Sequence, residues 1–148
     1  MEIEKKYLIP KLPDNLASYP HRQIKQGYIS TFPVIRIRQI DNQYILTIKG
    51  KGLLEREEHE LEISREEFEH LSLKVEGLII HKTRYYIAYI DYTIELDLFH
   101  DDYDGLQLAE VEFDTRHAAE TFIPPDWFGE DVTNDKRYHN SFLSQKKE

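Results

Sequence analysis

The sequence contains no cysteine and only one methionine and one tryptophan in 148 residues. The absence of cysteine excludes disulfides, thiolate catalysis and zinc sites with cysteine ligands. No apolar run is long enough to span a bilayer, and positions 2 and 4 are acidic where a secretory signal would need basic residues. We therefore expect a cytoplasmic protein that does not associate with membranes.

Basic residues are also comparatively few. Lysine and arginine together number 19 against 28 aspartates and glutamates, which gives a formal net charge of -9. Nucleic acids and anionic membranes attract basic surfaces, so we expect neither as a partner. The seven histidines are scattered without metal-ligand spacing. An apolar fraction of 40% over this length predicts a single domain covering residues 1–148.

Short runs with a period of two dominate the chain and predict about eight strands. The runs "VIRIRQI" and "QYILTIKG" flank Asp41-Asn42, which predicts a tight hairpin. Helices are fewer. A capping box at Ser64 and Glu67 predicts a helix over 65–74, Thr115 caps a second over 116–122, and a terminal helix is predicted over 134–147. The predicted class is mainly β with peripheral helices (α+β).

The alternating runs place charged side chains on one face and apolar side chains on the other. The charged set is Glu2, Glu4, Lys6, Arg36, Arg38, Lys49, Glu60, Glu62, Lys82, Arg84, Glu95, Asp97, Glu110 and Glu112. One interpretation is a one-sided sheet with a wet, charged face. The other is a closed eight-stranded antiparallel β-barrel with its charges in the lumen and short helices packed outside. Charges grouped by sign favour the barrel, and closure would remove exposed strand edges.

The residue types on this face indicate what it could bind. Acid clusters without histidine or cysteine are hard-oxygen sites that suit one or two Mg²⁺ or Mn²⁺ ions. Clustered arginines and lysines suit phosphate oxygens. A small anion that needs several bases together with a divalent metal is a polyphosphate.

The order of the charged pairs along the chain resembles that of a known family. Glu2-x-Glu4-x-Lys6 is similar to the ExExK signature of the CYTH superfamily, the triphosphate tunnel metalloenzymes. The later pairs follow the family's order: Arg36-x-Arg38, Thr47-x-Lys49, Glu60-x-Glu62, Lys82-x-Arg84, Glu95-x-Asp97 and Glu110-x-Glu112. The tail "WFGEDVTNDKRYHN" also resembles the family's closing segment. The resemblance implies an eight-stranded antiparallel barrel and metal-dependent chemistry on triphosphates.

We expect roles for the charged residues on this basis. Glu2, Glu4, Glu110 and Glu112 would hold the metal, and Glu60, Glu62, Glu95 and Asp97 would be either ligands or structural partners of the bases. The substrate-binding set is expected to be Lys6, Arg36, Arg38, Lys49, Lys82, Arg84, Lys136 and Arg137. For the last two, a solvated helix end is the alternative. Lys82 could act as a base beside Tyr28, which could instead be only packed, and Glu4 completes the expected catalytic set.

The expected reaction is hydrolysis of inorganic triphosphate to pyrophosphate and phosphate, with some action on nucleoside triphosphates. The alternatives are a class IV-type adenylate cyclase, a thiamine triphosphatase and a non-catalytic polyphosphate-binding module. A cyclase needs an adenine pocket, for which no segment argues. A binding module could lack the metal acids, which are present. The sequence leaves monomer and homodimer both open.

Overall fold

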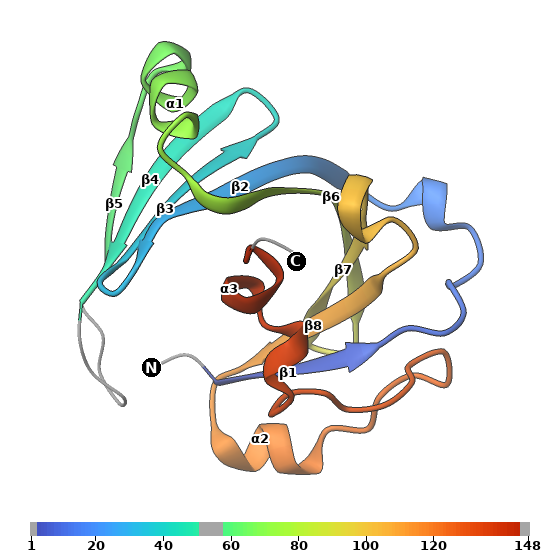
Figure 1. The fold of residues 1–148 in the computed structure, drawn as a ribbon. Helices are drawn as coiled ribbons and strands as arrows, with labels where there is room; N and C mark the ends of the chain where they lie inside the picture. Colours follow the sequence, from blue (N-terminus) through green and yellow to red (C-terminus); the bar gives the residue numbers. More distant parts are fainter. Residues whose placement is uncertain (1–2, 51–57, 146–148) are drawn as a thin grey trace. The chain divides into compact units, whose positions relative to one another are not determined.

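The computed structural model describes residues 3–50 and 58–145. Its strands form one eight-stranded sheet in the order β1-β8-β7-β6-β2-β3-β4-β5 (Figure 1). The strands are β1 Ile3–Leu8, β2 His21–Thr31, β3 Val34–Ile40, β4 Gln43–Lys49, β5 Glu58–Glu62, β6 Glu76–Tyr89, β7 Tyr92–Phe99 and β8 Gln107–Phe113. Pairing is antiparallel, as in β1–β8 and β3–β4. The prediction of a mainly β protein with few short helices is confirmed.

Two helices begin where their caps were predicted. The α-helices are α1 Arg65–Ser72, α2 Arg116–Thr121 and α3 Asn140–Leu143, and the 3₁₀ turns are η1 Leu16–Ser18, η2 Asp101–Tyr103 and η3 Lys136–Tyr138. Ser64 accepts a hydrogen bond from the Glu67 backbone and Glu67 returns one to Ser64, which completes the capping box of α1. Thr115 caps α2 by accepting from the Ala118 N–H.

The prediction of one terminal helix over 134–147 is wrong. The described residues there form the short turn η3 and the single-turn helix α3, separated by His139 in an extended conformation. The Asp135 carboxylate accepts from both the backbone and the guanidinium of Arg137. Such local side-chain bonds offer the backbone an alternative to helix, which is why apolar spacing overestimated this element.

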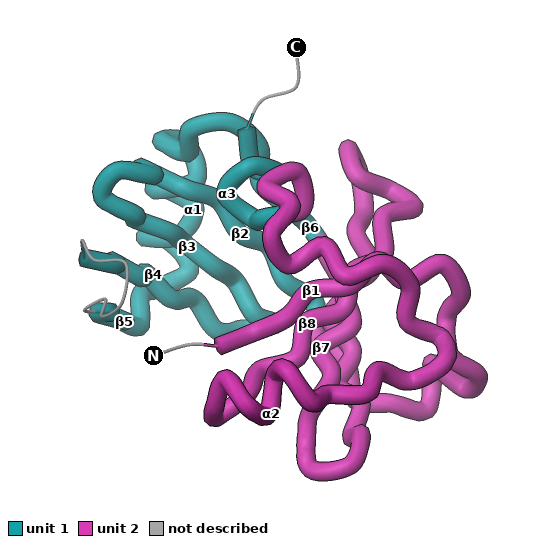
Figure 2. Tube along the Cα trace, turned by 90° about the horizontal axis from the view of Figure 1, so that it is seen from below, with its two compact units in different colours: residues 1, 23–81, 139–148 teal, residues 2–22, 82–138 magenta. Residues whose placement is uncertain are grey.

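The chain divides into two compact units, drawn in different colours in Figure 2. Unit 1 contains the described residues of 23–81 and 139–145, and unit 2 contains residues 3–22 and 82–138. In unit 1, helix α1 packs on β3 and β4, and the ring centroids of its buried Phe68 and of Tyr44 lie 5.2 Å apart. Ile37 of β3 is fully buried. The apolar face of these strands is therefore the face that α1 covers.

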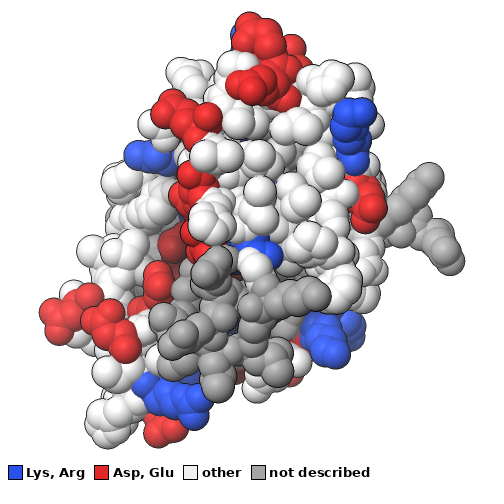
Figure 3. All heavy atoms as spheres, turned by 90° about the vertical axis from the view of Figure 1, so that its left-hand side faces the viewer, with Lys and Arg blue, Asp and Glu red and all other residues white. Residues whose placement is uncertain are grey.

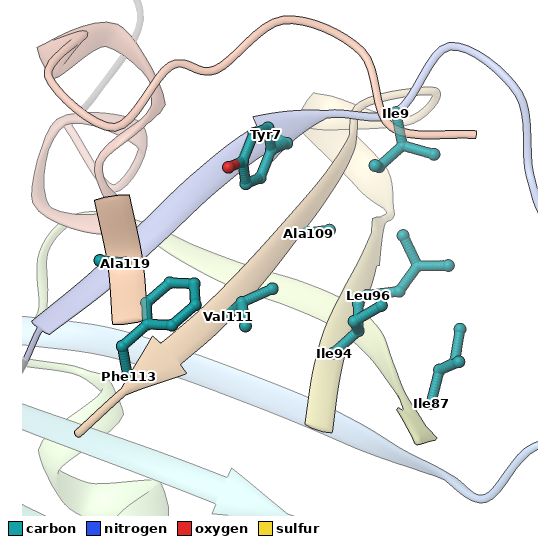
Figure 4. Close-up of a cluster of buried hydrophobic side chains, with 9 residues drawn as sticks. All are labelled: Tyr7, Ile9, Ile87, Ile94, Leu96, Ala109, Val111, Phe113 and Ala119. Carbon is teal, nitrogen blue, oxygen red and sulfur yellow. The ribbon is translucent and has the colours of Figure 1, made fainter. Parts of the chain in front are cut away.

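Unit 2 holds the larger apolar core, shown in Figure 4. Its buried members are Tyr7, Ile9, Ile87, Ile94, Leu96, Ala109, Val111, Phe113 and Ala119. Alternate residues of β1, β7 and β8 supply most of them, and Ala119 comes from α2. Each fully buried aliphatic or phenyl side chain contributes roughly 1.5–3 kcal/mol, so this face anchors unit 2 and leaves the opposite face to the charged residues.

The expected closed eight-stranded barrel is not what the structure shows. The strand order ends at β1 and at β5, and no β1–β5 pair occurs within residues 3–50 and 58–145. Residues 129–133, which we call the edge segment, bind the outer edge of β1 within unit 2. The Glu130 carbonyl accepts from the Leu8 N–H, and the Lys6 carbonyl accepts from the Val132 N–H. A loop that covers an edge protects its backbone groups without closing the sheet.

Gly129 is required for this close approach. A Cβ at position 129 would lie 2.7 Å from the backbone oxygen of Leu8, inside normal contact distance. The glycine lets its N–H reach that oxygen at 2.7 Å. None of the described helices is long and apolar enough to cross a membrane.

Ile90 provides a test of backbone strain in the β6–β7 turn. It has a φ of 55° and is 75% exposed, although β-branched residues disfavour this region. Ile90→Asn should raise the free energy of unfolding by about 1 kcal/mol, because asparagine tolerates left-handed backbone and little apolar burial is lost. Urea denaturation measures the change.

Ile123 is the matched control for that substitution. It is 76% exposed, but it is not among the described residues that have a positive φ. Ile123→Asn should leave the free energy of unfolding within about 0.5 kcal/mol of the parent. Equal effects of the two substitutions would contradict the strain explanation.

Candidate functional site

The charged face of unit 2 is built by the register of its strands. Opposite residues on neighbouring antiparallel strands share a face. Lys6 of β1 lies opposite Glu110 of β8, and Glu110 lies opposite Glu95 of β7. Arg84 of β6 lies opposite Asp97 of β7. Residues separated by up to about a hundred positions in the sequence are thereby gathered on one surface, as the alternation predicts.

Asp97 is a buried carboxylate of this face that pairs with two cations. Arg84 donates to its two carboxylate oxygens at 2.7 and 2.9 Å, and Lys82 Nζ lies 2.8 Å from one of them. The exposed fractions are 2% for Asp97, 0% for Lys82 and 8% for Arg84. Arg84 also pairs with Glu95. Both Asp97 oxygens are thus already occupied by cations.

The protonation states follow from this packing. Burial alone would raise the pKa of Asp97, but Lys82 and Arg84 outweigh it and hold the pKa well below its usual range. Burial would lower the pKa of Arg84, yet Asp97 and Glu95 raise it above its ordinary value. Glu95 is different, because burial raises its pKa despite the opposing charge of Arg84. The network therefore favours the ionised form of the Asp97 carboxyl and the protonated form of the Arg84 guanidinium.

Lys6 connects the charged face to the edge segment. Its Nζ lies 3.2 Å from Glu110 and donates to the Tyr138 carbonyl at 2.9 Å, while its backbone N–H donates to Thr133 Oγ1. Burial would raise the pKa of Glu110, but Lys6 and Lys82 lower it. The ammonium group of Lys6 is therefore held in place from both sides. Thr133, which lies in the tail that resembles the family's closing segment, therefore helps to hold β1 in place.

The expected metal ligands are only partly brought together. Glu4 lies directly opposite Glu112 in the β1–β8 register, so two carboxylates share one position of the face. Within residues 3–50 and 58–145, no group of three or more acidic or histidine side chains is arranged to hold a metal. Glu2 lies outside the described residues. Glu60 and Glu62 lie on β5 in unit 1, where all five strand residues are exposed.

The remaining expected residues divide between the two units. Lys136 and Arg137 of unit 2 are exposed, and Arg137 pairs with Asp135 at 2.6 Å. In unit 1, Arg36 lies opposite Tyr28 and also opposite Thr47, while Lys49 lies opposite Val34. Figure 3 shows acidic side chains predominating over basic ones on one face of the molecule, in keeping with the net charge of -9.

Sequence reasoning missed Gln26. This fully buried residue of β2 lies opposite Arg38, and its Oε1 accepts from Arg38 Nε at 2.9 Å. The signal was available, since the period of two places Gln26 on the same face as Tyr28 in "HRQIKQGYIS". It was overlooked because only charged side chains were counted on that face.

Two opposed carboxylates and a set of buried lysine and arginine groups thus lie on one face of an antiparallel sheet. These residue types suit hard cations and anions with several oxygens. The family comparison agrees with that chemistry. The model of the CYTH domain family matches residues 1–139, and the chain belongs to this family.

Similar proteins span nearly the whole chain. An inorganic triphosphatase of Nitrosomonas europaea is 43% identical over 149 residues, covering 97% of this chain and 96% of the relative. Another, of Acetivibrio thermocellus, is 36% identical over 96% of this chain and 92% of the relative. The solved structure of the inorganic triphosphatase NE1496 superposes with a TM-score of 0.80 at 38% identity, covering 99% and 96% of the two chains.

The Asp97 network predicts a large loss of stability for Asp97→Asn. At pH 7 the substitution should lower the free energy of unfolding by about 3 kcal/mol, because it leaves buried Lys82 without its counter-charge. Asp97 has a lowered folded pKa, so its contribution is present above the ordinary value of about 3.9 and fades as the pH falls below it. Urea denaturation at pH 7 and below pH 4 should show the difference shrinking.

The exposed turn residue Asp91 is the control for this carboxylate-to-amide change. Asp91→Asn should change the free energy of unfolding by no more than about 0.5 kcal/mol at either pH. A similar small effect for Asp97→Asn at pH 7 would show that the buried carboxylate does not hold the network together.

Proposed function

We propose that this chain hydrolyses inorganic triphosphate to pyrophosphate and phosphate in a reaction that depends on a divalent metal. The observation that carries the proposal is the charged face of unit 2, where Glu4 and Glu112 oppose each other beside the Lys6–Glu110 pair. The relatives that match almost the full length are named inorganic triphosphatases, which supports the same reaction here.

The donor set of this face fits a hard divalent cation. Carboxylate oxygens are the ligands that Mg²⁺ and Mn²⁺ prefer, and two carboxylates opposite each other on one face can share one cation. We assign metal binding to Glu4 and Glu112, with Glu110 beside them and Glu2 as a further candidate. Bound metal would supply charge neutralisation on phosphate oxygens and a water of lowered pKa. Asp97 is better suited to holding Lys82 and Arg84, whose charges already occupy both its oxygens.

The basic residues are proposed to bind phosphate oxygens. In unit 2 these are Lys6, Lys82 and Arg84, and in unit 1 they are Arg36, Arg38 and Lys49. The guanidinium fork can take two phosphate oxygens at once, while lysine offers a point charge. Positioned cations stabilise charge that develops as the P–O bond breaks, so no covalent nucleophile is needed.

Lys82 and Tyr28 remain proposed catalytic residues. Lys82 Nζ lies 2.8 Å from an oxygen of the Asp97 carboxylate. Because this ion pair holds Nζ in place, we propose that Lys82 acts by its charge on phosphate oxygens, in place of the base role expected from the sequence. Tyr28 is buried in unit 1 and shares its face with Arg36. Roles for Glu60, Glu62, Lys136 and Arg137 rest on the sequence pattern alone.

A cyclase is the second candidate, and the substrate assay separates it from a hydrolase. The solved structure of a putative adenylate cyclase from Bacillus halodurans is 17% identical to this chain, with a TM-score of 0.62, and supports the fold alone. We further propose a cytoplasmic monomer or homodimer acting on a small triphosphate.

The direct prediction concerns the unmodified protein. With Mg²⁺ or Mn²⁺ it should release phosphate from inorganic triphosphate, and EDTA should abolish the release because the carboxylate pair then lacks its cation. Phosphate release is measured in parallel with inorganic triphosphate, ATP, thiamine triphosphate and pyrophosphate, and ATP reactions are analysed for cyclic AMP. Cyclic AMP as the main product, or no turnover of any substrate, would refute the proposed reaction.

The carboxylate pair yields a second prediction. Glu4→Gln and Glu112→Gln should each lower kcat for inorganic triphosphate on the order of 100-fold, because an amide ligates the cation more weakly than a carboxylate. Stability should be retained, since one of two opposed charges is removed. Glu120 of α2 is exposed and serves as the control, with Glu120→Gln expected to match the parent. Full activity in either pair variant would remove that residue from the metal site.

A further inference from the structure

Gln26 is a buried neutral side chain among cations. It is 0% exposed, and its Oε1 accepts from Arg38 Nε at 2.9 Å. The Nε atom of arginine can only donate, so the amide oxygen must be the atom that faces it. The orientation of the amide is therefore defined, and its NH₂ group points away from this bond.

The NH₂ group of Gln26 has no acceptor. Within the part of the chain that the structure describes, Gln26 Nε2 is covered from solvent and has no hydrogen-bond partner. Buried amide donors are nearly always paired, because leaving one without an acceptor is costly. An isolated donor of this kind needs an explanation, and a ligand oxygen is one.

A second buried donor on the same face also lacks an acceptor. Arg36 Nε is also buried without a hydrogen-bond partner among the described residues. The β2–β3 register places Gln26 opposite Arg38 and Tyr28 opposite Arg36, so Gln26, Arg36 and Arg38 project from the same face of adjacent strands. Two buried N–H groups without acceptors, flanked by a guanidinium whose Nε is anchored, form a donor cluster that suits an anion with several oxygens.

We propose that Gln26 is a further triphosphate-binding residue. Its Nε2 donates to a phosphate oxygen, and its Oε1 accepts from Arg38 Nε and so positions the Arg38 guanidinium. A neutral donor adds a contact without adding to the repulsion between neighbouring cations. The inference rests on the proposed function, and it assigns to Gln26 a direct contact as well as the positioning of Arg38.

A double-mutant cycle distinguishes direct contact from an effect through Arg38 alone. The proteins are the parent, Gln26→Met, Arg38→Met, the double variant and Gln43→Met, in which an exposed glutamine of β4 is changed as a control. Gln26→Met should lower kcat/KM for inorganic triphosphate with Mg²⁺ about tenfold, the size of one hydrogen bond to a charged group. The same change in the Arg38→Met background should still cost at least about fivefold. If Gln26→Met causes no further fall in kcat/KM in the Arg38→Met background, the direct contact is overturned.

The salt dependence of kcat/KM gives an independent measurement. Arg38→Met removes a charge and should flatten the fall of kcat/KM with NaCl, whereas Gln26→Met removes none and should keep the parent slope. A slope for Gln26→Met as flat as that of Arg38→Met would show that Gln26 acts only through Arg38, and would overturn the proposal.

Two further arms keep the result decisive. Thermal unfolding of each variant establishes that it folds. If Gln26→Met does not fold, Gln26→Glu replaces it, because it keeps the acceptor for Arg38 and removes the donor. A fall in kcat/KM of at least about tenfold, persisting in high salt where added charge is screened, supports the proposal, and parent-like kinetics overturn it.

Failure of the proposed function gives a different result. If the proposed function is wrong, the parent protein releases no phosphate from inorganic triphosphate. Calorimetric titration of all variants with inorganic triphosphate then tests whether Gln26 contacts the anion. Weaker binding by Gln26→Met in both backgrounds supports the contact, and binding equal to that of Gln43→Met overturns it. Turnover by the parent together with equal kinetics in Gln26→Met and Gln43→Met overturns the inference alone.

Discussion

One buried carboxylate organises the charged face of unit 2. Asp97 accepts two hydrogen bonds from Arg84 and lies 2.8 Å from Lys82 Nζ, with all three side chains less than a tenth exposed. Two cations so close would repel each other in an interior without it. Because the carboxylate holds both, the face can keep cations away from water, where their interaction with an anion is strongest.

The same face must also be supported from behind. In unit 2 the apolar core formed by Tyr7, Leu96, Val111 and their neighbours lies on the other side of the strands (Figure 4). A strand exposes alternate residues to opposite faces, so the side chains that pack the core fix the direction of those that carry charge. Packing and chemistry are thus two consequences of one register.

The chain's own tail replaces part of the closure that a barrel would provide. The edge segment occupies the outer backbone groups of β1, and it brings Thr133 and the Tyr138 carbonyl to Lys6. A basic residue expected to bind phosphate is therefore positioned by a segment more than 120 residues later in the chain, as the separation of 127 between Lys6 and Thr133 shows. Edge protection and side-chain positioning are achieved by the same contacts.

The sequence by itself determined the alternation of charged and apolar faces, the β3–β4 hairpin and the capped starts of α1 and α2. These depend on a period of two and on bonds between near neighbours, both of which are local properties of the chain. Only the tertiary structure decided that Asp97 pairs with Lys82 and Arg84, that Gln26 joins Arg38, and that the sheet ends at β1 and β5. Those outcomes depend on which distant strands are neighbours and in what register, because contacts across strands are not encoded in the spacing within any one of them.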